Sequence, residues 1–212
     1  MSKLVAGHQH RIRLNSPVDS IARQGGRVVV RSCGRSESFD RIFIACHSDQ
    51  ALRLLEDASG AEHEVLGAVP YQPNVAVLHT DAAQMPTRRR AWAAWNYLIP
   101  AGTAAKASVT YYLNSLQGLT TPTDYFVTLN SDDRIRPETV IAQIPCEHPI
   151  FSVVSTKAQR RHGEVNGANL TYYCGAWWRN GFHEDGVVSA LAALEDFDRK
   201  ENHAQLHLRR AG

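Results

Sequence analysis

Cys174-Gly-Ala-Trp-Trp-Arg-Asn-Gly-Phe-His-Glu-Asp-Gly-Val-Val-Ser-Ala190 is the most informative segment of this chain. The apolar and aromatic run 170–174 leads into it and predicts a buried strand. Three glycines punctuate the following loop: Gly175, Gly181 and Gly186. Carboxylates at 184 and 185 and helically spaced apolar residues from 187 predict a helix starting near Asp185. Such a strand, loop and helix can bring backbone amides close to a ligand, whereas the alternative is a tight turn into a packed helix.

This segment and several short motifs on either side of it resemble, in a fixed order, those of the FAD-dependent amine oxidase-like proteins, also described as NAD/FAD-binding proteins. The match spans residues 10–195 and is closest at 174–186, the flavin-binding segment of that family. The other matching segments are residues 16–21, 45–52, 78–81, 94–96 and 145–149. The resemblance implies an oxidoreductase, a flavoprotein that binds FAD and acts on a small molecule whose identity the motifs do not indicate.

The resemblance also implies positions for the cofactor. Phe182 would face the substrate beside the flavin, and the backbone amide of His183 would reach the flavin ring. Strand backbone at Val18 would hold the adenine. The full set of candidate cofactor-binding residues is Val18, Gly175, Phe182, His183, Glu184, Asp185 and Gly186. Because carboxylates repel phosphate, we expect backbone contacts to the pyrophosphate, with the Gly186 amide free at the first helical position. The alternatives are core packing for Phe182 and Val18 and helix capping for Asp185.

One signature of the family is missing from the chain. No Gly-x-Gly-x-x-Gly turn for the FAD diphosphate occurs, and the doublet Gly25-Gly26 predicts a hairpin turn. We therefore expect the C-terminal, truncated part of such a flavoprotein, which binds FAD only if the missing half is supplied. The absence of this turn is compatible with three origins of the chain: a naturally short protein, a start position assigned too far downstream, or a chain that was shortened. The family's lysine near the flavin is absent from 75–79, so no catalytic residue is assigned.

The composition of the chain gives information on nucleic-acid binding, membrane insertion and metal binding. The chain has 212 residues, of which 43% are hydrophobic, and a net charge of +2. The charge gives no indication of nucleic-acid binding, and the basic run 88–90 fits a solvated loop. No signal peptide and no membrane-spanning run is visible, and four scattered cysteines fit a cytoplasmic protein. Since no Cys-x-x-Cys pair occurs among the four cysteines, we expect no metal site.

The coarse pattern predicts an α+β or α/β fold, with an incomplete Rossmann-like FAD-binding domain and a mixed-sheet substrate domain. We place the partial FAD-binding domain at 1–55, the substrate-type domain at 56–165, and the return to the first domain at 166–212. Expected strands are 11–14, 18–23, 28–32, 41–45, 75–79, 91–98, 108–113, 125–129 and 170–174. Expected helices start at 48 and near 185 and cover 60–69 and 152–161.

A second function class stays open. The apolar run Arg41-Ile-Phe-Ile-Ala45 predicts a strand that needs a neighbour on each side, and one neighbour belongs to the missing half. The chain then is a non-catalytic binding or assembly module, which self-associates or requires a partner chain supplying the dinucleotide-binding half.

Overall fold

The computed structural model describes residues 2–99, 108–130 and 132–211, and the chain divides into two compact units. Unit 1 combines Met1–Pro70 with Pro149–Gly212, and unit 2 is Tyr71–His148. The boundaries therefore lie inside the range 56–165 expected for the substrate-type domain. The assignment of cofactor and substrate roles to these ranges stays a prediction.

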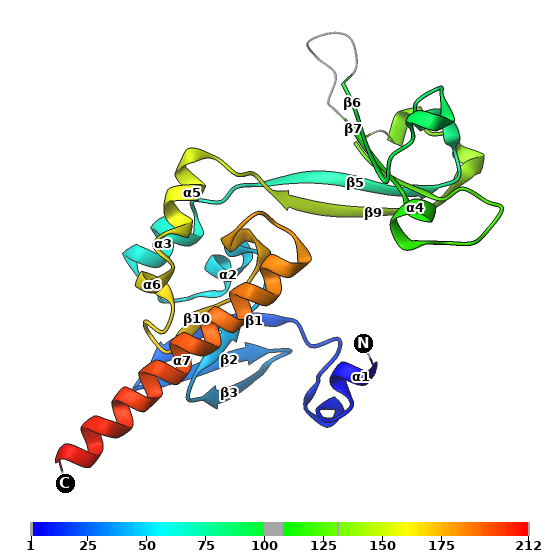
Figure 1. Cartoon of the computed structure of the whole chain (residues 1–212). Helices are drawn as coiled ribbons and strands as arrows, with labels where there is room; N and C mark the ends of the chain where they lie inside the picture. Colours follow the sequence, from blue (N-terminus) through cyan, green and yellow to red (C-terminus); the bar gives the residue numbers. More distant parts are fainter. Residues whose placement is uncertain (1, 100–107, 131, 212) are drawn as a thin grey trace. The chain divides into compact units, whose positions relative to one another are not determined.

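Unit 1 is a mixed α/β structure with a three-stranded sheet and a two-stranded sheet (Figure 1). Its strands are β1 (Val18–Gln24), β2 (Arg27–Ser32), β3 (Arg35–Phe39), β4 (Ile42–Ile44) and β10 (Thr171–Tyr173). Its helices are α1 (Ser2–Val5), α2 (Ser48–Leu54), α3 (Gly60–Leu66), α5 (Val153–Gln159), α6 (His162–Val165) and α7 (His183–Ala211). Two short 3-10 turns complete it, η1 (Gln9–Arg11) and η6 (Ala176–Trp178).

The antiparallel hairpin β1–β2 confirms the turn expected at Gly25-Gly26. Both glycines have positive φ, at 58° and 74°, a conformation that side chains disfavour and that a tight hairpin turn requires. β3 then pairs antiparallel with β2. The prediction of a strand at 11–14 is wrong, because a 3-10 turn occupies Gln9–Arg11 instead.

The two-stranded sheet carries the segment that opens the sequence analysis. β10 runs parallel to β4, with Tyr172 opposite Phe43 and Tyr173 opposite Ile44. One face of β10 packs against α7 through Tyr172, Cys174 and Ala193, and the Tyr172 and Phe43 rings stack at 4.8 Å. The strand, the glycine-bearing loop and the helix are therefore all confirmed, with α7 starting two residues before Asp185.

Capping residues explain where three shorter helices of unit 1 begin. Ser59 and Ser152 each accept a hydrogen bond from the amide three residues on, at 3.3 Å and 3.1 Å, and start α3 and α5. α2 begins at Ser48, but its N-cap is His47 rather than Ser48.

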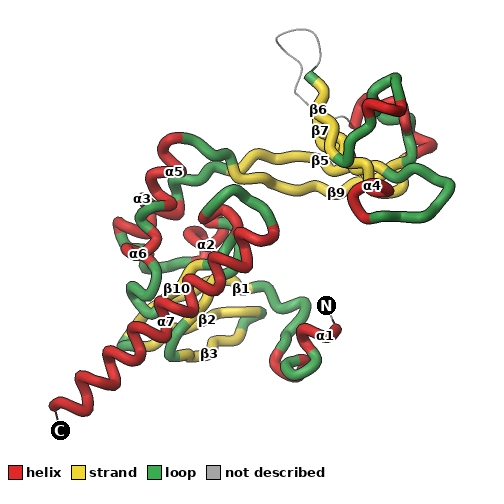
Figure 2. The backbone as a smooth tube through the Cα atoms, viewed as in Figure 1, coloured by secondary structure: helices red, strands yellow, loops and turns green. Residues whose placement is uncertain are grey.

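Unit 2 is built on a five-stranded sheet in the order β6-β7-β8-β5-β9. Figure 2 labels four of these strands: β5, β6, β7 and β9. The strands are β5 (Tyr71–His79), β6 (Trp95–Leu98), β7 (Ser108–Tyr112), β8 (Phe126–Leu129) and β9 (Val140–Pro149), whose last residue lies in unit 1. One helix, α4 (Leu113–Gln117), and four 3-10 turns connect them: η2 (Ala82–Gln84), η3 (Arg89–Ala91), η4 (Asp132–Arg134) and η5 (Pro137–Thr139). β5, β7 and β8 confirm three expected strands.

Candidate functional site

The candidate site lies where two neighbouring parallel strands end. β4 leads through Ala45, Cys46 and His47 into α2, and β10 leads through a loop into α7. The carboxyl ends of parallel strands, followed by helix N-termini, form the edge at which open α/β sheets bind ligands. The indole Nε1 of Trp177 donates to the Cys46 carbonyl at 3.1 Å and joins the two connections.

Two buried tryptophans fix the loop after β10. Trp177 and Trp178 stack with ring centroids 4.1 Å apart, and Trp178 Nε1 donates to the Tyr173 carbonyl at 3.1 Å. A Cβ atom at Gly175 would lie 2.3 Å from Trp177 Nε1. Gly175 is therefore explained by the tryptophan packed against its backbone, whatever contact it makes with a ligand.

Side chains from two helices hold the same loop. Gln159 of α5 donates from Nε2 to the carbonyls of Trp177 at 2.8 Å and Arg179 at 2.7 Å. Ser189 of α7 accepts from the Gly175 amide at 2.8 Å and donates to the Gly186 carbonyl at 2.8 Å. The loop is thus fixed at both ends before any ligand is considered.

Asp185 caps the N-terminus of α7. Its buried carboxylate accepts from the amides of Asn180 at 3.2 Å and Phe182 at 3.0 Å, through the same oxygen. The other oxygen lies 3.5 Å from Arg179 Nε. The helix-capping interpretation of Asp185 is therefore confirmed, and its carboxylate is occupied by the protein.

Phe182 and Val18 lie at the surface of unit 1. The Phe182 side chain is 71% exposed at the start of α7, and Val18 is 38% exposed at the start of β1. The core-packing interpretation of both residues is wrong. Packing within unit 1 therefore does not explain why an aromatic ring stands beside the N-terminus of α7.

The expectation for Gly186 is also wrong. Gly186 is the fourth residue of α7, and its amide donates to the Phe182 carbonyl at 3.3 Å. This is the first hydrogen bond of the helix, so the Gly186 amide is not available to a phosphate group. The shift arises because α7 begins at His183 rather than near Asp185.

The amides that remain available around this turn include those of Ala176, His183 and Glu184. None has a hydrogen-bond partner among the described residues, and the last two belong to the first turn of α7. A Cβ atom at Gly186 would lie 4.0 Å from the Ala176 nitrogen, which places this amide beside the same helix turn. Amides at a helix N-terminus favour an anionic group such as a phosphate.

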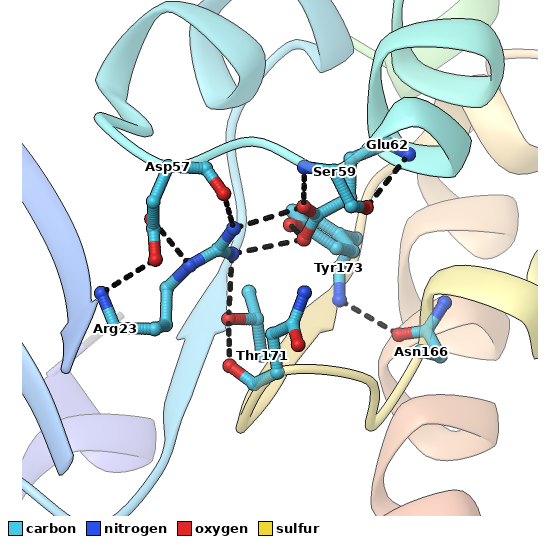
Figure 3. Close-up of polar contacts among 8 residues, drawn as sticks. Arg23, Asp57, Ser59, Glu62, Asn166, Thr171 and Tyr173 are labelled. Carbon is cyan, nitrogen blue, oxygen red and sulfur yellow. Dashed lines mark hydrogen bonds and ion pairs between the residues drawn. The ribbon is translucent and has the colours of Figure 1, made fainter. Parts of the chain in front are cut away.

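A buried ionic cluster lies on the opposite face of β10 and was not anticipated from the sequence (Figure 3). The Arg23 guanidinium of β1 donates to both Glu62 oxygens, at 2.8 and 2.9 Å, and Tyr173 donates its hydroxyl to Glu62 at 2.5 Å. Arg23 also contacts Asp57 at 2.7 Å and the Thr171 hydroxyl at 3.1 Å. The cluster therefore joins β1, α3 and β10.

The charges of this cluster compensate one another. Burial alone raises the pKa of Glu62, but hydrogen bonds from Arg23, Tyr173 and the Ser59 amide lower the pKa to about 2. Burial and the hydrogen bond to Glu62 raise the pKa of Tyr173 well above its ordinary value. Glu62 is thus ionised and Tyr173 neutral at physiological pH, and the cluster serves to hold β10 in place.

Unit 2 contains a buried polar row of neutral side chains that the sequence analysis also missed. The Asp81 amide donates to His79 Nδ1 at 3.0 Å, so His79 carries its proton on Nε2 and donates it to Thr128 Oγ1 at 2.8 Å. Thr128 Oγ1 and Thr110 Oγ1 lie 2.9 Å apart in a further hydrogen bond. Burial lowers the pKa of His79, which keeps the imidazole neutral.

Metal sites and membrane-spanning helices are two further features considered for the part of the chain that the structure describes. No group of three or more histidine, cysteine, aspartate or glutamate side chains is placed to hold a metal ion in that part of the chain. Within the same residues, no helix has the length and apolar character that crossing a membrane requires.

Solved structures with a similar fold are known, although no family model and no curated protein matches the chain. A CLA-producing fatty acid isomerase from P. acnes superposes with a TM-score of 0.62 at 15% identity, over 94% of this chain and 50% of that chain. Wild-type putrescine oxidase bound to putrescine gives a TM-score of 0.60 at 11% identity, over 92% and 51%. Cyclohexylamine oxidase from Brevibacterium oxydans IH-35A gives 0.55 at 14% identity, over 92% and 51%.

These similarities show the fold. The chain has a mixed α/β fold that matches part of these oxidases and of the isomerase, and it spans about half the length of each. At 11–15% identity the likeness does not carry an activity with it.

Proposed function

We propose that this chain is part of an FAD-dependent oxidoreductase of the amine oxidase-like family, with a small-molecule substrate that is not identified. The observation that carries the proposal is the pair of available amides, His183 and Glu184, at the N-terminus of α7 where parallel strands end. The shared fold with amine oxidases supports it. FAD, when bound, supplies the group that accepts a hydride.

The residues present fit the anionic part of such a cofactor. The amides of His183, Glu184 and Ala176 suit a pyrophosphate, because they are donors at the positive end of the helix dipole. Gly186 presents no side chain toward the Ala176 amide, so the backbone is open to a ligand there. Phe182 offers an exposed ring next to this turn, where it can exclude water from a bound flavin. No side chain is assigned to proton transfer.

The cofactor site requires a further segment. β4 pairs only with β10 among the described residues, so the backbone of Phe43, which points away from β10 in the parallel register, faces an edge without a strand. α7 also exposes an apolar stripe at Val187, Leu191 and Leu194. A strand followed by a helix with an apolar face would cover both surfaces, as the glycine-rich, dinucleotide-binding half of an FAD domain does.

The same open edge favours a second candidate function. A non-catalytic binding or assembly module would use the β4 edge to pair with a partner chain or with a second copy of itself. The two candidates differ in the cofactor, since only the first requires the available amides of α7. Sedimentation of the isolated chain as a stable monomer would count against the assembly module.

The test of the flavin proposal deletes one amide at a time. His183→Pro removes the first amide of α7 at a position where proline is well tolerated, and His183→Ala removes the side chain but keeps the amide. FAD affinity is measured by flavin fluorescence for the chain alone and for the chain co-expressed with a strand-turn-helix segment that carries Gly-x-Gly-x-x-Gly. We expect His183→Pro to weaken binding and His183→Ala to leave it unchanged. Failure of the wild-type chain to bind FAD in either form would refute the proposal.

A further inference from the structure

Asp185 holds the backbone of the loop that precedes α7, although the resemblance assigns it to the cofactor site. One carboxylate oxygen accepts from the amides of both Asn180 and Phe182, at 3.2 and 3.0 Å, and the side chain is only 6% exposed. Both bonds are charge-assisted, which makes them stronger than bonds to a neutral acceptor. A carboxylate so occupied has no oxygen aimed at a phosphate group.

The two amides that Asp185 binds, those of Asn180 and Phe182, precede the available amides of His183 and Glu184 in the sequence. Asp185 takes up the Phe182 amide, while those of His183 and Glu184, next along the chain, stay available. Without the carboxylate, the segment 180–182 loses two of its backbone attachments. Two backbone bonds of that segment remain: the Gly181 amide donates to the Ala176 carbonyl at 3.1 Å, and the Phe182 carbonyl accepts from the Gly186 amide at 3.3 Å.

We propose that Asp185 is a positioning residue, which orders the segment 180–182 so that the His183 and Glu184 amides are presented to the cofactor without a contact from its own side chain. This inference rests on the proposed flavin function. The physical reason is preorganisation: a loop that is already ordered does not have to be ordered when the ligand binds. Phe182 is positioned by the same contact, because its amide is one of the two that Asp185 binds.

Glu184 provides the matched control. It is the adjacent residue, carries the same charge and is exposed, and no hydrogen bond of its side chain occurs among the described residues. Loss of one negative charge near a phosphate would strengthen FAD binding at either position if the charge alone mattered. Asp185→Asn and Glu184→Gln therefore make the same change in charge, but only the first removes the charge-assisted attachment of the loop.

The experiment measures two quantities on the full chain at a temperature where every variant is folded. Hydrogen exchange reports the Asn180 and Phe182 amides without ligand, and flavin fluorescence reports FAD affinity. For Asp185→Asn we expect faster exchange at both amides and affinity about tenfold weaker, with a larger change for Asp185→Ala. For Glu184→Gln, which keeps the carboxylate of Asp185, we expect unchanged exchange at the Asn180 and Phe182 amides.

The outcomes separate the two proposals. Unchanged exchange at Asn180 and Phe182 in Asp185→Asn overturns the positioning role, and so does FAD binding that is as tight as, or tighter than, that of the wild-type chain. If the wild-type chain binds no FAD, the flavin function fails. Faster exchange in Asp185→Asn, but not in Glu184→Gln, would in that case still show that Asp185 orders the loop.

Discussion

The two units bury polar side chains in opposite ways. In unit 1, Arg23 and Glu62 are both ionised and buried, and Tyr173 completes the cluster. In unit 2, His79 is neutral and forms a row with two threonine hydroxyls. A buried ion pair is costly to desolvate and leaves a bare charge when one partner is lost, whereas a neutral row leaves only an unsatisfied donor or acceptor. The comparison therefore predicts different sensitivities for the two units.

The largest effect is expected from Glu62→Gln in unit 1. The change leaves the buried Arg23 guanidinium without its bidentate carboxylate and should lower the free energy of unfolding by about 3–5 kcal/mol. Glu64→Gln on the same helix is the control, since the 66% exposed Glu64 only pairs with Arg161 at the surface, and we expect less than about 1 kcal/mol there. Chemical denaturation measures both. Equal losses would show that burial of the pair does not matter.

A double replacement sharpens the first comparison. Arg23→Met with Glu62→Leu removes both charges at once and should recover part of the stability that Glu62→Gln loses, because no buried charge is left, while the buried Tyr173 hydroxyl loses its acceptor. If the double variant is as unstable as the single one, the cluster stabilises the fold through geometry that apolar side chains cannot replace.

The next effect is a pH dependence that belongs to the ionic cluster. The pKa of Glu62 is about 2 in the folded state, against an ordinary value of 4.5. A depressed carboxylate pKa stabilises the fold above the unfolded value, so this contribution is complete above pH 4.5 and is lost as the pH falls toward 2. Melting temperatures should fall more steeply in the wild-type chain than in the Arg23→Met, Glu62→Leu variant across that window. Parallel curves would assign the acid sensitivity to other carboxylates.

A smaller effect is expected in the neutral row of unit 2. Thr128→Val removes the acceptor for His79 Nε2 and should cost about 1–3 kcal/mol, because a buried N–H donor is left without a partner. Thr128→Ser keeps the hydroxyl and is the control, with only a methyl group lost. Thermal unfolding compares the two variants. A loss in Thr128→Val no greater than in Thr128→Ser would mean that the hydrogen bond contributes nothing measurable.

Local signals in the sequence predicted the local parts of this structure. The strand at 170–174, the glycine loop and the following helix are confirmed because apolar content, glycine and acidic N-terminal residues act within a few positions of one another. β3 was missed since Arg35–Phe39 has almost no apolar residue, and β9 was missed since Pro145 interrupts its pattern.

The ionic cluster and the exact start of α7 could not be predicted from local sequence, because both depend on contacts between side chains and distant backbone or side-chain groups. Arg23, Glu62 and Tyr173 are separated by 39 and 111 residues, so only the tertiary fold brings them together. The start of α7 is set by the Asp185 side chain, which binds the amides of Asn180 and Phe182 and moves the first helical residue to His183. The sequence analysis assigned an available amide to Gly186, whereas that amide is bonded within α7 and those of His183 and Glu184 are available.

The smallest effect on stability is expected at Phe182, and it separates the fold of the site from its function. Because the ring is 71% exposed, Phe182→Ala should change the free energy of unfolding by less than about 0.5 kcal/mol, not by the 3–5 kcal/mol of a core phenylalanine. If the ring faces a flavin, as the proposed function implies, the same variant should also impair FAD affinity when the strand-turn-helix segment is co-expressed. Phe126→Ala, in the core of unit 2, is the control for a buried ring. A large loss of stability in Phe182→Ala would indicate that the ring is buried in an interface between two copies of the chain. That result would favour the assembly module over the flavoprotein.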